Sequence, residues 1–297
     1  MYPSPVKGAS LLLAFKPVSR TVLIVGTQGL AASRAFSALE AEANVVVTSP
    51  FPLEHACEEI RWRVAHDEVR WSPYSQDETN LEFAKLLDTL PDIAFVCITD
   101  TLSGARNPRA RSSAAALYDI CRLRHILVNT ADAPALCDFT FPSTHRFPSQ
   151  NTGQASHLQI AITTNGRGCR LAGRIRRELV AKLHPGCGDA VSNVTRLREM
   201  AREAPSKEGS ADAEDREDSI SNTPLNTPVP QLSEKAEEDP IERNLRRMRW
   251  VNQVSEYWPM DRLSTLDDRE MRKILEDAAS ATQTHTVLQV PPPGVCY

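Results

Sequence analysis

Short apolar runs alternate with longer amphipathic segments over the first 135 residues. The apolar runs, rich in Val, Ile and Leu, predict strands at 21–25, 44–48, 69–72, 93–98 and 126–128. The segments between them predict helices at 30–39, 53–64, 79–87 and 110–121. Strands that alternate with helices at this spacing are typical of parallel sheets. The pattern therefore predicts an α/β fold with a Rossmann-like, doubly wound parallel sheet over residues 1–135.

The alternation of predicted strands and helices ends after residue 135. Phe139 to Phe141 and Leu158 to Thr163 read as strands joined by a loop, which predicts a small mixed segment over 136–180. Leucine and isoleucine then recur at helical spacing, at Leu171, Ile175, Leu179 and Leu183.

A helical domain is expected at 181–203 and 241–280, because Ile241, Leu245, Met248 and Val251 form another helical stripe. Ser264 to Asp267 fits a capping box that opens the last helix.

An acidic stretch interrupts this helical domain. Residues 204–240 contain ten acids, three bases, five prolines and no aromatic residue. Such a segment buries too little apolar surface to offset its ordering entropy, so it is expected to be a disordered linker. The linker carries a net charge of −7 and the whole chain −4, which leaves about +3 for the remainder. A mildly basic folded part suits an acidic small-molecule substrate.

The amino-acid composition indicates the compartment and the partners of the protein. The seven cysteines are scattered without a C-x-x-C pair, which argues against a disulfide framework or a zinc site and favours a reducing compartment. No apolar run approaches the length of a membrane span. We therefore expect a cytoplasmic protein that binds neither nucleic acid nor membrane and holds no metal ion of its own.

The first strand runs into a glycine-containing turn, IVGTQGLAASRAF. A dinucleotide fingerprint needs glycine at its first, third and sixth positions, with alanine tolerated last. Gly26 and Ala31 fit, but Gln28 stands where the backbone should approach phosphate, and Gly29 follows one step later. The second strand ends in Thr48-Ser49 rather than in an acid for a ribose. Nucleotide binding and an ordinary strand–helix turn both remain open from this motif.

Acids follow two other strands where α/β sheets hold their ligands. Thr99-Asp100 ends one strand, and Asp132 follows Asn129 just past another. Asp132 is a candidate to accept a proton from a large anionic molecule. Asp100 is equally well read as a helix cap, and Asp132 and Asp138 as turn or cap acids.

The strand predicted at Leu158 to Thr163 leads into Thr164, Asn165 and Gly166 and then into a helix rich in arginine. Guanidinium groups match carboxylates in a bidentate manner, so these arginines are candidates to hold an acidic substrate. The alternative is that they form a solvated helix face. They are Arg167, Arg170, Arg174 and Arg176.

The order of these pieces resembles the siroheme synthase dehydrogenase/ferrochelatase family, particularly its fungal stand-alone form. The matching stretches are IVGTQGLAASRAF, the strand ends VVVTSP and CITD, LVNTADAPALCDFTFP, LQIAITTNGRGCRLAGRIRREL and RMRWVNQVSEYW. They span about residues 9–203 and 240–277.

This resemblance implies a homodimeric enzyme of siroheme biosynthesis. Such an enzyme oxidises the tetrapyrrole precorrin-2 to sirohydrochlorin with NAD, then inserts ferrous iron, which is a substrate. Residues 1–135 would be the NAD-binding domain and 136–180 the dimerisation segment. Asp132, which matches the family's essential aspartate, would assist both steps.

The remaining site assignments are as follows. The cofactor-binding residues are expected to be Gly26, Thr27, Gly29, Leu30, Ser49, Pro50, Phe51, Thr99 and Asp100. The substrate-binding residues are expected to be Asn129, Thr164, Asn165, Gly166, Arg167, Arg170 and Arg174.

One departure from the family keeps alternatives open. The family shows three consecutive glycines after the first strand, and Thr27-Gln28 replaces the later two. The runner-up is an enzyme that retains only iron insertion because its nucleotide loop has decayed. An alternative from a different functional class is that the chain is a non-catalytic sensor of a nucleotide or tetrapyrrole.

Overall fold

The protein is described by a computed structural model that covers residues 8–75, 80–104, 107–202 and 240–279, without the side chains of 240–246 and 277–279. Its contacts define two compact units. The first comprises Met1–Pro142 with Thr163–Cys169, and the second comprises Ser143–Ile162 with Arg170–Tyr297. The segment predicted at 136–180 is therefore shared between the two units. Residues 204–239 of the predicted linker lie outside the described residues.

A five-stranded parallel sheet forms the centre of the first unit, as predicted. Its strands are β1 (Thr21–Val25), β2 (Asn44–Thr48), β3 (Arg70–Trp71), β4 (Ile93–Ile98) and β5 (Leu127–Thr130). Their order in the sheet is β3-β2-β1-β4-β5, and every pair is parallel. The chain thus winds outward from β1 in both directions, which confirms the doubly wound, Rossmann-like class.

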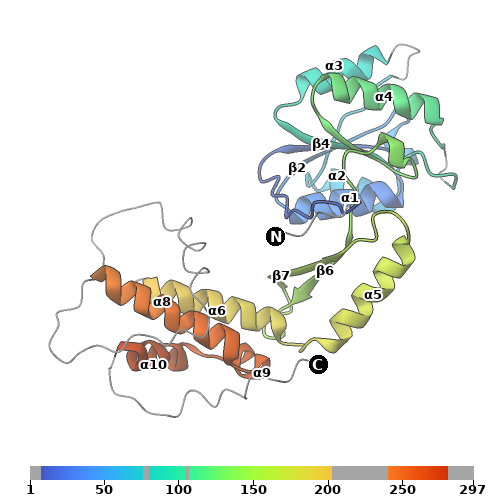
Figure 1. Ribbon diagram of the computed structural model, residues 1–297. Helices are drawn as coiled ribbons and strands as arrows, with labels where there is room; N and C mark the ends of the chain where they lie inside the picture. The colour runs from blue at the N-terminus through green and yellow to red at the C-terminus, as the bar shows by residue number, and fades with distance from the viewer. Residues whose placement is uncertain (1–7, 76–79, 105–106, 203–239, 280–297) are drawn as a thin grey trace, which may run out of the picture. The chain divides into compact units, whose positions relative to one another are not determined.

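Helices cover both faces of this sheet (Figure 1). They are α1 (Gly29–Glu40), α2 (Glu58–Ala65), α3 (Leu81–Thr89) and α4 (Arg111–Leu123), with short 3-10 turns at η1 (Leu53–His55) and η2 (Pro134–Leu136). Val22 and Ile24 of β1 pack with α1 and α2, whereas Leu23 and Val25 pack with α3 and α4. The alternation follows from the pleat, and burial of both faces explains why β1 reads as a continuous apolar run.

Gly26 lets β1 and β4 approach each other at their carboxyl ends. Its φ is +114°, a conformation that favours glycine. A Cβ at this position would collide with Thr99 Oγ1 and would lie 3.2 Å from the Cβ of Asp100. Thr99, in turn, donates hydrogen bonds to the carbonyl of Val25 from both its backbone N–H and its hydroxyl, each at 2.8 Å.

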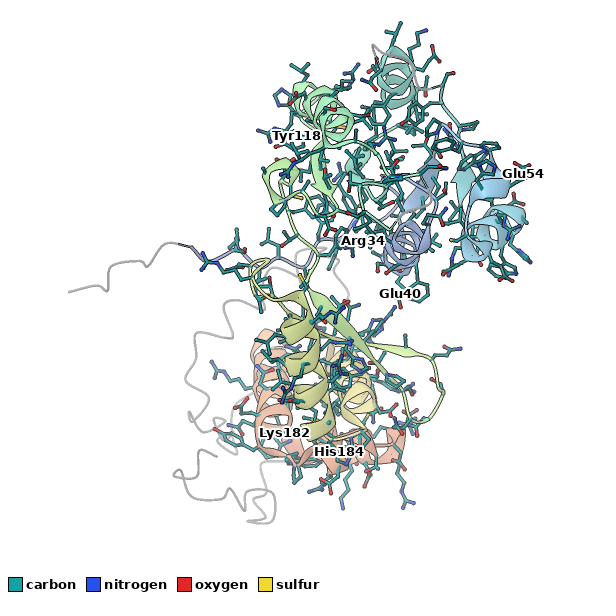
Figure 2. The ribbon with its side chains drawn as sticks, turned by 90° about the vertical axis from the view of Figure 1, so that its right-hand side faces the viewer. Arg34, Glu40, Glu54, Tyr118, Lys182 and His184 are labelled. Atoms are coloured by element: carbon teal, nitrogen blue, oxygen red, sulfur yellow. The ribbon has the colours of Figure 1, made fainter. Side chains whose placement is uncertain are left out.

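The strand predicted at Phe139 to Phe141 is wrong, because this segment is irregular and the next strand begins at Ser143. Phe139 and Phe141 instead anchor the segment to the sheet core. Their rings lie 5.1 and 6.2 Å from that of Phe95. The guanidinium of Arg34, which Figure 2 labels beside α1, stacks 3.8 Å above the Phe141 ring. Aromatic burial, rather than strand pairing, explains the apolar pattern here.

The second unit combines a two-stranded antiparallel sheet with helices. Its elements are β6 (Ser143–Pro148), β7 (Ala155–Ile162), α5 (Cys169–Lys182), α6 (Cys187–Arg202), α8 (Pro240–Tyr257), α9 (Met260–Ser264) and α10 (Asp268–Ala279). Buried side chains of α6, α8, α9 and α10, among them Leu197, Val251 and Met271, form one core. On α5, by contrast, Leu171 and Leu179 are exposed, as is Leu183 just after the helix.

The last helix starts later than the predicted capping box. Ser264 ends α9, and its hydroxyl donates to the carbonyl of Asp261 at 2.7 Å. Asp267 caps α10 instead, because its carboxylate accepts a hydrogen bond from the backbone N–H of Glu270 at 2.8 Å.

The glycine pair Gly26 and Gly29 allows a stability test of the β1–β4 contact. Gly26→Ala is expected to lower the free energy of unfolding by roughly 2–4 kcal/mol, through backbone strain and overpacking. Gly29→Ala is the control, because a Cβ there meets nothing within 4 Å and alanine favours a helix. Chemical denaturation followed by circular dichroism measures both. Equal stability of Gly26→Ala and the wild type would contradict the tight contact.

Candidate active site at the carboxyl edge of the sheet

A small hollow lies at the carboxyl edge of the sheet, between the ends of β1, β2 and β4. Eight residues line it: Gly26, Thr27, Gln28, Ser49, Phe51, His55, Asp100 and Asn107. Five of these were predicted to bind a cofactor, so the structure brings most of that set together. The hollow has a volume of about 20 Å³, which holds about one water molecule.

The amino-terminal end of α1 borders this hollow and is open to an anion. No side chain caps the helix, and no acid stands in its first turn. The backbone N–H groups in the first turn of a helix carry a partial positive charge, which favours phosphate. Gly29, at the first helical position, has open space around it.

The side chain of Gln28 crosses from α1 to the η1 turn. Its amide nitrogen donates to the carbonyl of His55 at 3.0 Å. Beside it, the backbone N–H of Cys57 donates to the carbonyl of Thr27 at 2.9 Å. The first loop of the sheet is thus fastened to the segment that follows β2.

Asp100 is held in a buried network that the sequence did not reveal. The guanidinium of Arg109 donates to both carboxylate oxygens of Asp100, at 2.9 and 2.8 Å. Arg109 also donates to the hydroxyl of Tyr74 at 2.8 Å and to that of Ser113 at 3.1 Å. The side chains of Arg109 and Asp100 are 3% and 13% exposed. Burial raises the pKa of Tyr74, although the nearby Arg109 opposes that shift.

Asp138 is also committed to the structure. Its carboxylate accepts hydrogen bonds from the backbone N–H of Val128 at 2.9 Å and from Arg122 at 2.8 Å. The hydroxyl of Tyr118, labelled on α4 in Figure 2, is 3.3 Å away. Asp138 therefore fastens the segment after η2 to β5 and α4, as the turn-acid alternative expected.

Asp132 differs from both of these acids. It lies two residues beyond β5, with φ +51°, and its side chain is exposed. Within the described part of the chain, no hydrogen bond or ion pair engages its carboxylate. Aspartate tolerates the left-handed conformation better than most residues. The turn therefore presents a free acid at the carboxyl edge.

The backbone on either side of Asp132 is nevertheless fixed. The N–H of Ala131 donates to the carbonyl of Ile98 at 2.9 Å, and the hydroxyl of Thr101 donates to the carbonyl of Ala131. The thiol of Cys137 donates to the carbonyl of Thr130 at 3.1 Å. Burial raises the pKa of Cys137, so this thiol stays protonated and able to donate.

Asn129 supports the same loop. Its amide nitrogen donates to the carbonyl of Phe139 at 2.9 Å. The nitrogen of the amide thus has a structural partner, while the predicted contact with substrate stays a prediction.

The turn at Thr164, Asn165 and Gly166 belongs to the first unit. Asn165 and Gly166 have φ values of +52° and +76°, which form a tight reversal. The Asn165 side chain donates to the carbonyl of Gly8 at 3.0 Å and accepts from the hydroxyl of Ser10 at 2.7 Å. The turn thereby fastens the amino-terminal segment.

The predicted substrate arginines fall in both units. Arg167 is exposed in the first unit, and Arg170 and Arg174 are exposed on α5 in the second. Arg174 pairs with Glu178 at 2.7 Å, an exposed contact of small energetic value. Arg176 instead donates to the carbonyl of Thr144, so it is partly structural.

Five residues of the edge were absent from the predicted site: Gln28, which directly follows the predicted Thr27, and Tyr74, Arg109, His55 and Asn107. Arg109 follows a proline in a loop and Tyr74 lies in another loop, so no local pattern marks them. Only the tertiary fold brings them to Asp100 or to the hollow.

Comparisons with protein families agree with this geometry. A family model described as putative NAD(P)-binding matches residues 13–143. Two further models, the central and C-terminal parts of sirohaem biosynthesis proteins, match residues 156–182 and 230–284.

Individual proteins show the same likeness. A siroheme biosynthesis protein of Schizosaccharomyces pombe is 28% identical over 290 residues, which are 98% of this chain and 88% of that protein. Siroheme synthase 1 of Klebsiella pneumoniae is 31% identical over 61% of this chain, but the match spans only 31% of that longer protein. Among solved structures, the precorrin-2 dehydrogenase SirC has a TM-score of 0.53 at 15% identity, covering 91% of this chain and 99% of that one.

Fold and site together define a protein built on a Rossmann-type NAD(P)-binding domain. The three family matches, taken in order along the chain, specify it further: over nearly its whole length the chain is similar to siroheme biosynthesis proteins. Among the helices that the structure describes, none is both long and apolar enough to cross a membrane.

The contrast between Asp100 and Asp132 can be tested by stability. Asp100→Asn breaks a buried ion pair and is expected to lower the free energy of unfolding by about 3 kcal/mol. Asp132→Asn is expected to change it by less than about 0.5 kcal/mol, because the side chain is exposed and asparagine tolerates the left-handed backbone. Urea denaturation of both variants measures the difference. A large loss in Asp132→Asn would reveal a structural role for that acid.

Proposed function

We propose that the chain oxidises precorrin-2 to sirohydrochlorin with NAD and then inserts ferrous iron to give siroheme. The family and the fold support this proposal, since SirC, which has the same fold, is a precorrin-2 dehydrogenase. The observation that carries it is the free carboxylate of Asp132, because the other two acids at this edge, Asp100 and Asp138, are both bound.

The residues around the hollow fit NAD. The open space around Gly29, the uncapped start of α1 and the absence of acid from its first turn suit a pyrophosphate. Gly29 and Leu30 would offer backbone N–H groups, with Thr99 and Asp100 beneath. Ser49, Pro50 and Phe51 would lie on the adenosine side, at the end of β2. When bound, NAD would supply the hydride acceptor.

Asp132 would act as the proton acceptor in both reactions. In the dehydrogenation, the substrate loses a hydride and a proton, and the proton passes to a carboxylate oxygen of Asp132. In the iron insertion, two pyrrole N–H protons leave as ferrous iron enters, and Asp132 would take up these protons in turn. Fixing the backbone around Asp132 while leaving its side chain free suits a group that must meet a substrate atom.

The tetrapyrrole carries carboxylates around its rim, so cationic side chains would hold it. Arg167, Arg170 and Arg174 are exposed and could each take a carboxylate in bidentate fashion. For Arg174 this requires exchange of Glu178, whose exposed ion pair costs little to break.

A second candidate function is iron insertion alone. Gln28 in the phosphate loop and the small volume of the hollow favour it. Oxidation of precorrin-2 that does not depend on added NAD, or no oxidation at all, would favour this candidate. A non-catalytic sensor, in contrast, would show neither oxidation nor iron insertion.

We also propose that the protein forms homodimers, through a surface that includes α5. Leu171 and Leu179 are 54% and 45% exposed on this helix, and Leu183, directly after its end, is 43% exposed. An apolar stripe of this kind is typical of an interface. The proposed compartment is the cytoplasm, in keeping with the free thiols among the described cysteines.

Asp132→Asn tests the catalytic assignment. Loss of a general base is expected to lower kcat for precorrin-2 oxidation about 100-fold or more. NAD affinity should remain unchanged, because Asp132 does not line the hollow. Absorbance of the tetrapyrrole follows the oxidation and the iron insertion separately, and calorimetry gives the NAD affinity. A variant that kept both activities would remove Asp132 from the mechanism.

Leu179→Glu tests the dimer. A charge in place of a buried leucine in both copies is expected to raise the dimer dissociation constant by roughly a hundredfold or more. Arg177→Glu is the control, since it puts the same residue on an exposed position of another face of α5. Light scattering over a concentration series measures the oligomeric state. Equal behaviour of the two variants would exclude this stripe as the interface.

A further inference from the structure

A hydrogen bond between Gln28 and His55 joins two residues that line the hollow in which a dinucleotide would lie. We call this bond, from the Gln28 amide nitrogen to the His55 carbonyl, the Gln28–His55 clasp. It spans from the start of α1 to the η1 turn, and both of its residues line the hollow. With a volume of about 20 Å³, the hollow as it stands has room for about one water molecule.

We infer that Gln28 is a latch that must release His55 before a dinucleotide binds, and that it thereby sets the affinity for NAD. This inference rests on the proposed use of NAD. A glycine at this position would leave the backbone open to phosphate, as the dinucleotide fingerprint requires. Here a half-buried side chain occupies that approach.

Release of the clasp needs only a side-chain rotation. The neighbouring bond from the N–H of Cys57 to the carbonyl of Thr27 belongs to the backbone and does not depend on Gln28. The η1 turn also keeps its own bonds, from His55 to Pro52 and from Ala56 to Leu53. The loop frame therefore persists when Gln28 turns away, and the approach from the hollow to the start of α1 becomes wider.

If Gln28 is a latch, its removal should lower the stability of the free protein and raise its affinity for NAD. Gln28→Ala removes one intramolecular hydrogen bond, so the free protein should melt slightly earlier. The same change removes the cost of opening, so NAD should bind about three- to tenfold more tightly. A residue that only maintained the fold would lower both quantities. A residue that donated directly to the pyrophosphate would weaken binding when removed.

The experiment is isothermal titration of the full chain with NAD, together with the melting temperature of the free protein. Gln28→Ala and Gln28→Asn are compared with the wild type, because the shorter amide of asparagine falls short of His55 and keeps polarity. Gln159→Ala, an exposed glutamine on β7, is the matched control. Both Gln28 variants should bind NAD more tightly, and the control should bind as the wild type does.

The outcomes separate the latch from the proposed cofactor. If the wild type binds NAD and the Gln28 variants bind it equally or more weakly, the latch is wrong and the cofactor stands. If only the variants bind, the latch is supported in its strongest form. If no protein binds NAD, the proposed cofactor is wrong, and the latch is withdrawn with it.

Discussion

The close approach of β1 and β4 at Gly26 is the constraint on which the rest of the site depends. Because this position lacks a Cβ, Thr99 can reach the carbonyl of Val25 and Asp100 can border the hollow. The next strand, β5, is then registered against β4, so that Ala131 meets the carbonyl of Ile98. The packing at Gly26 and the register of β5 against β4 thus together fix the position of the turn that presents Asp132.

The carboxyl edge separates two tasks in space. Near β1, β2 and β4 the chain builds a narrow hollow from backbone and small side chains, with the uncapped start of α1 beside it. Beyond β5 it builds a rigid turn with an exposed acid. In the proposed function, the hollow would serve the nucleotide and the turn would serve proton transfer.

Periodicity predicted the sheet well because strands buried on both faces leave continuous apolar runs, as in β1, β2 and β4. It failed at Phe139 to Phe141, where aromatic rings pack into the core from an irregular segment. The position of Asp132 just past the end of a strand was predictable, because it follows directly from the apolar run of β5. The roles of the acids were not, since only the fold brings Arg109 and Tyr74 to Asp100.

The ion pairs of Asp100 and Asp138 have an electrostatic consequence for the binding of a polyanionic ligand. Arg109 compensates the charge of Asp100, and Arg122 that of Asp138. Without these partners, a macrocycle rimmed with carboxylates would meet three negative charges along one edge and be repelled by each. With Asp100 and Asp138 compensated, the edge would repel such a molecule less, while Asp132 keeps its charge at the place proposed for proton transfer.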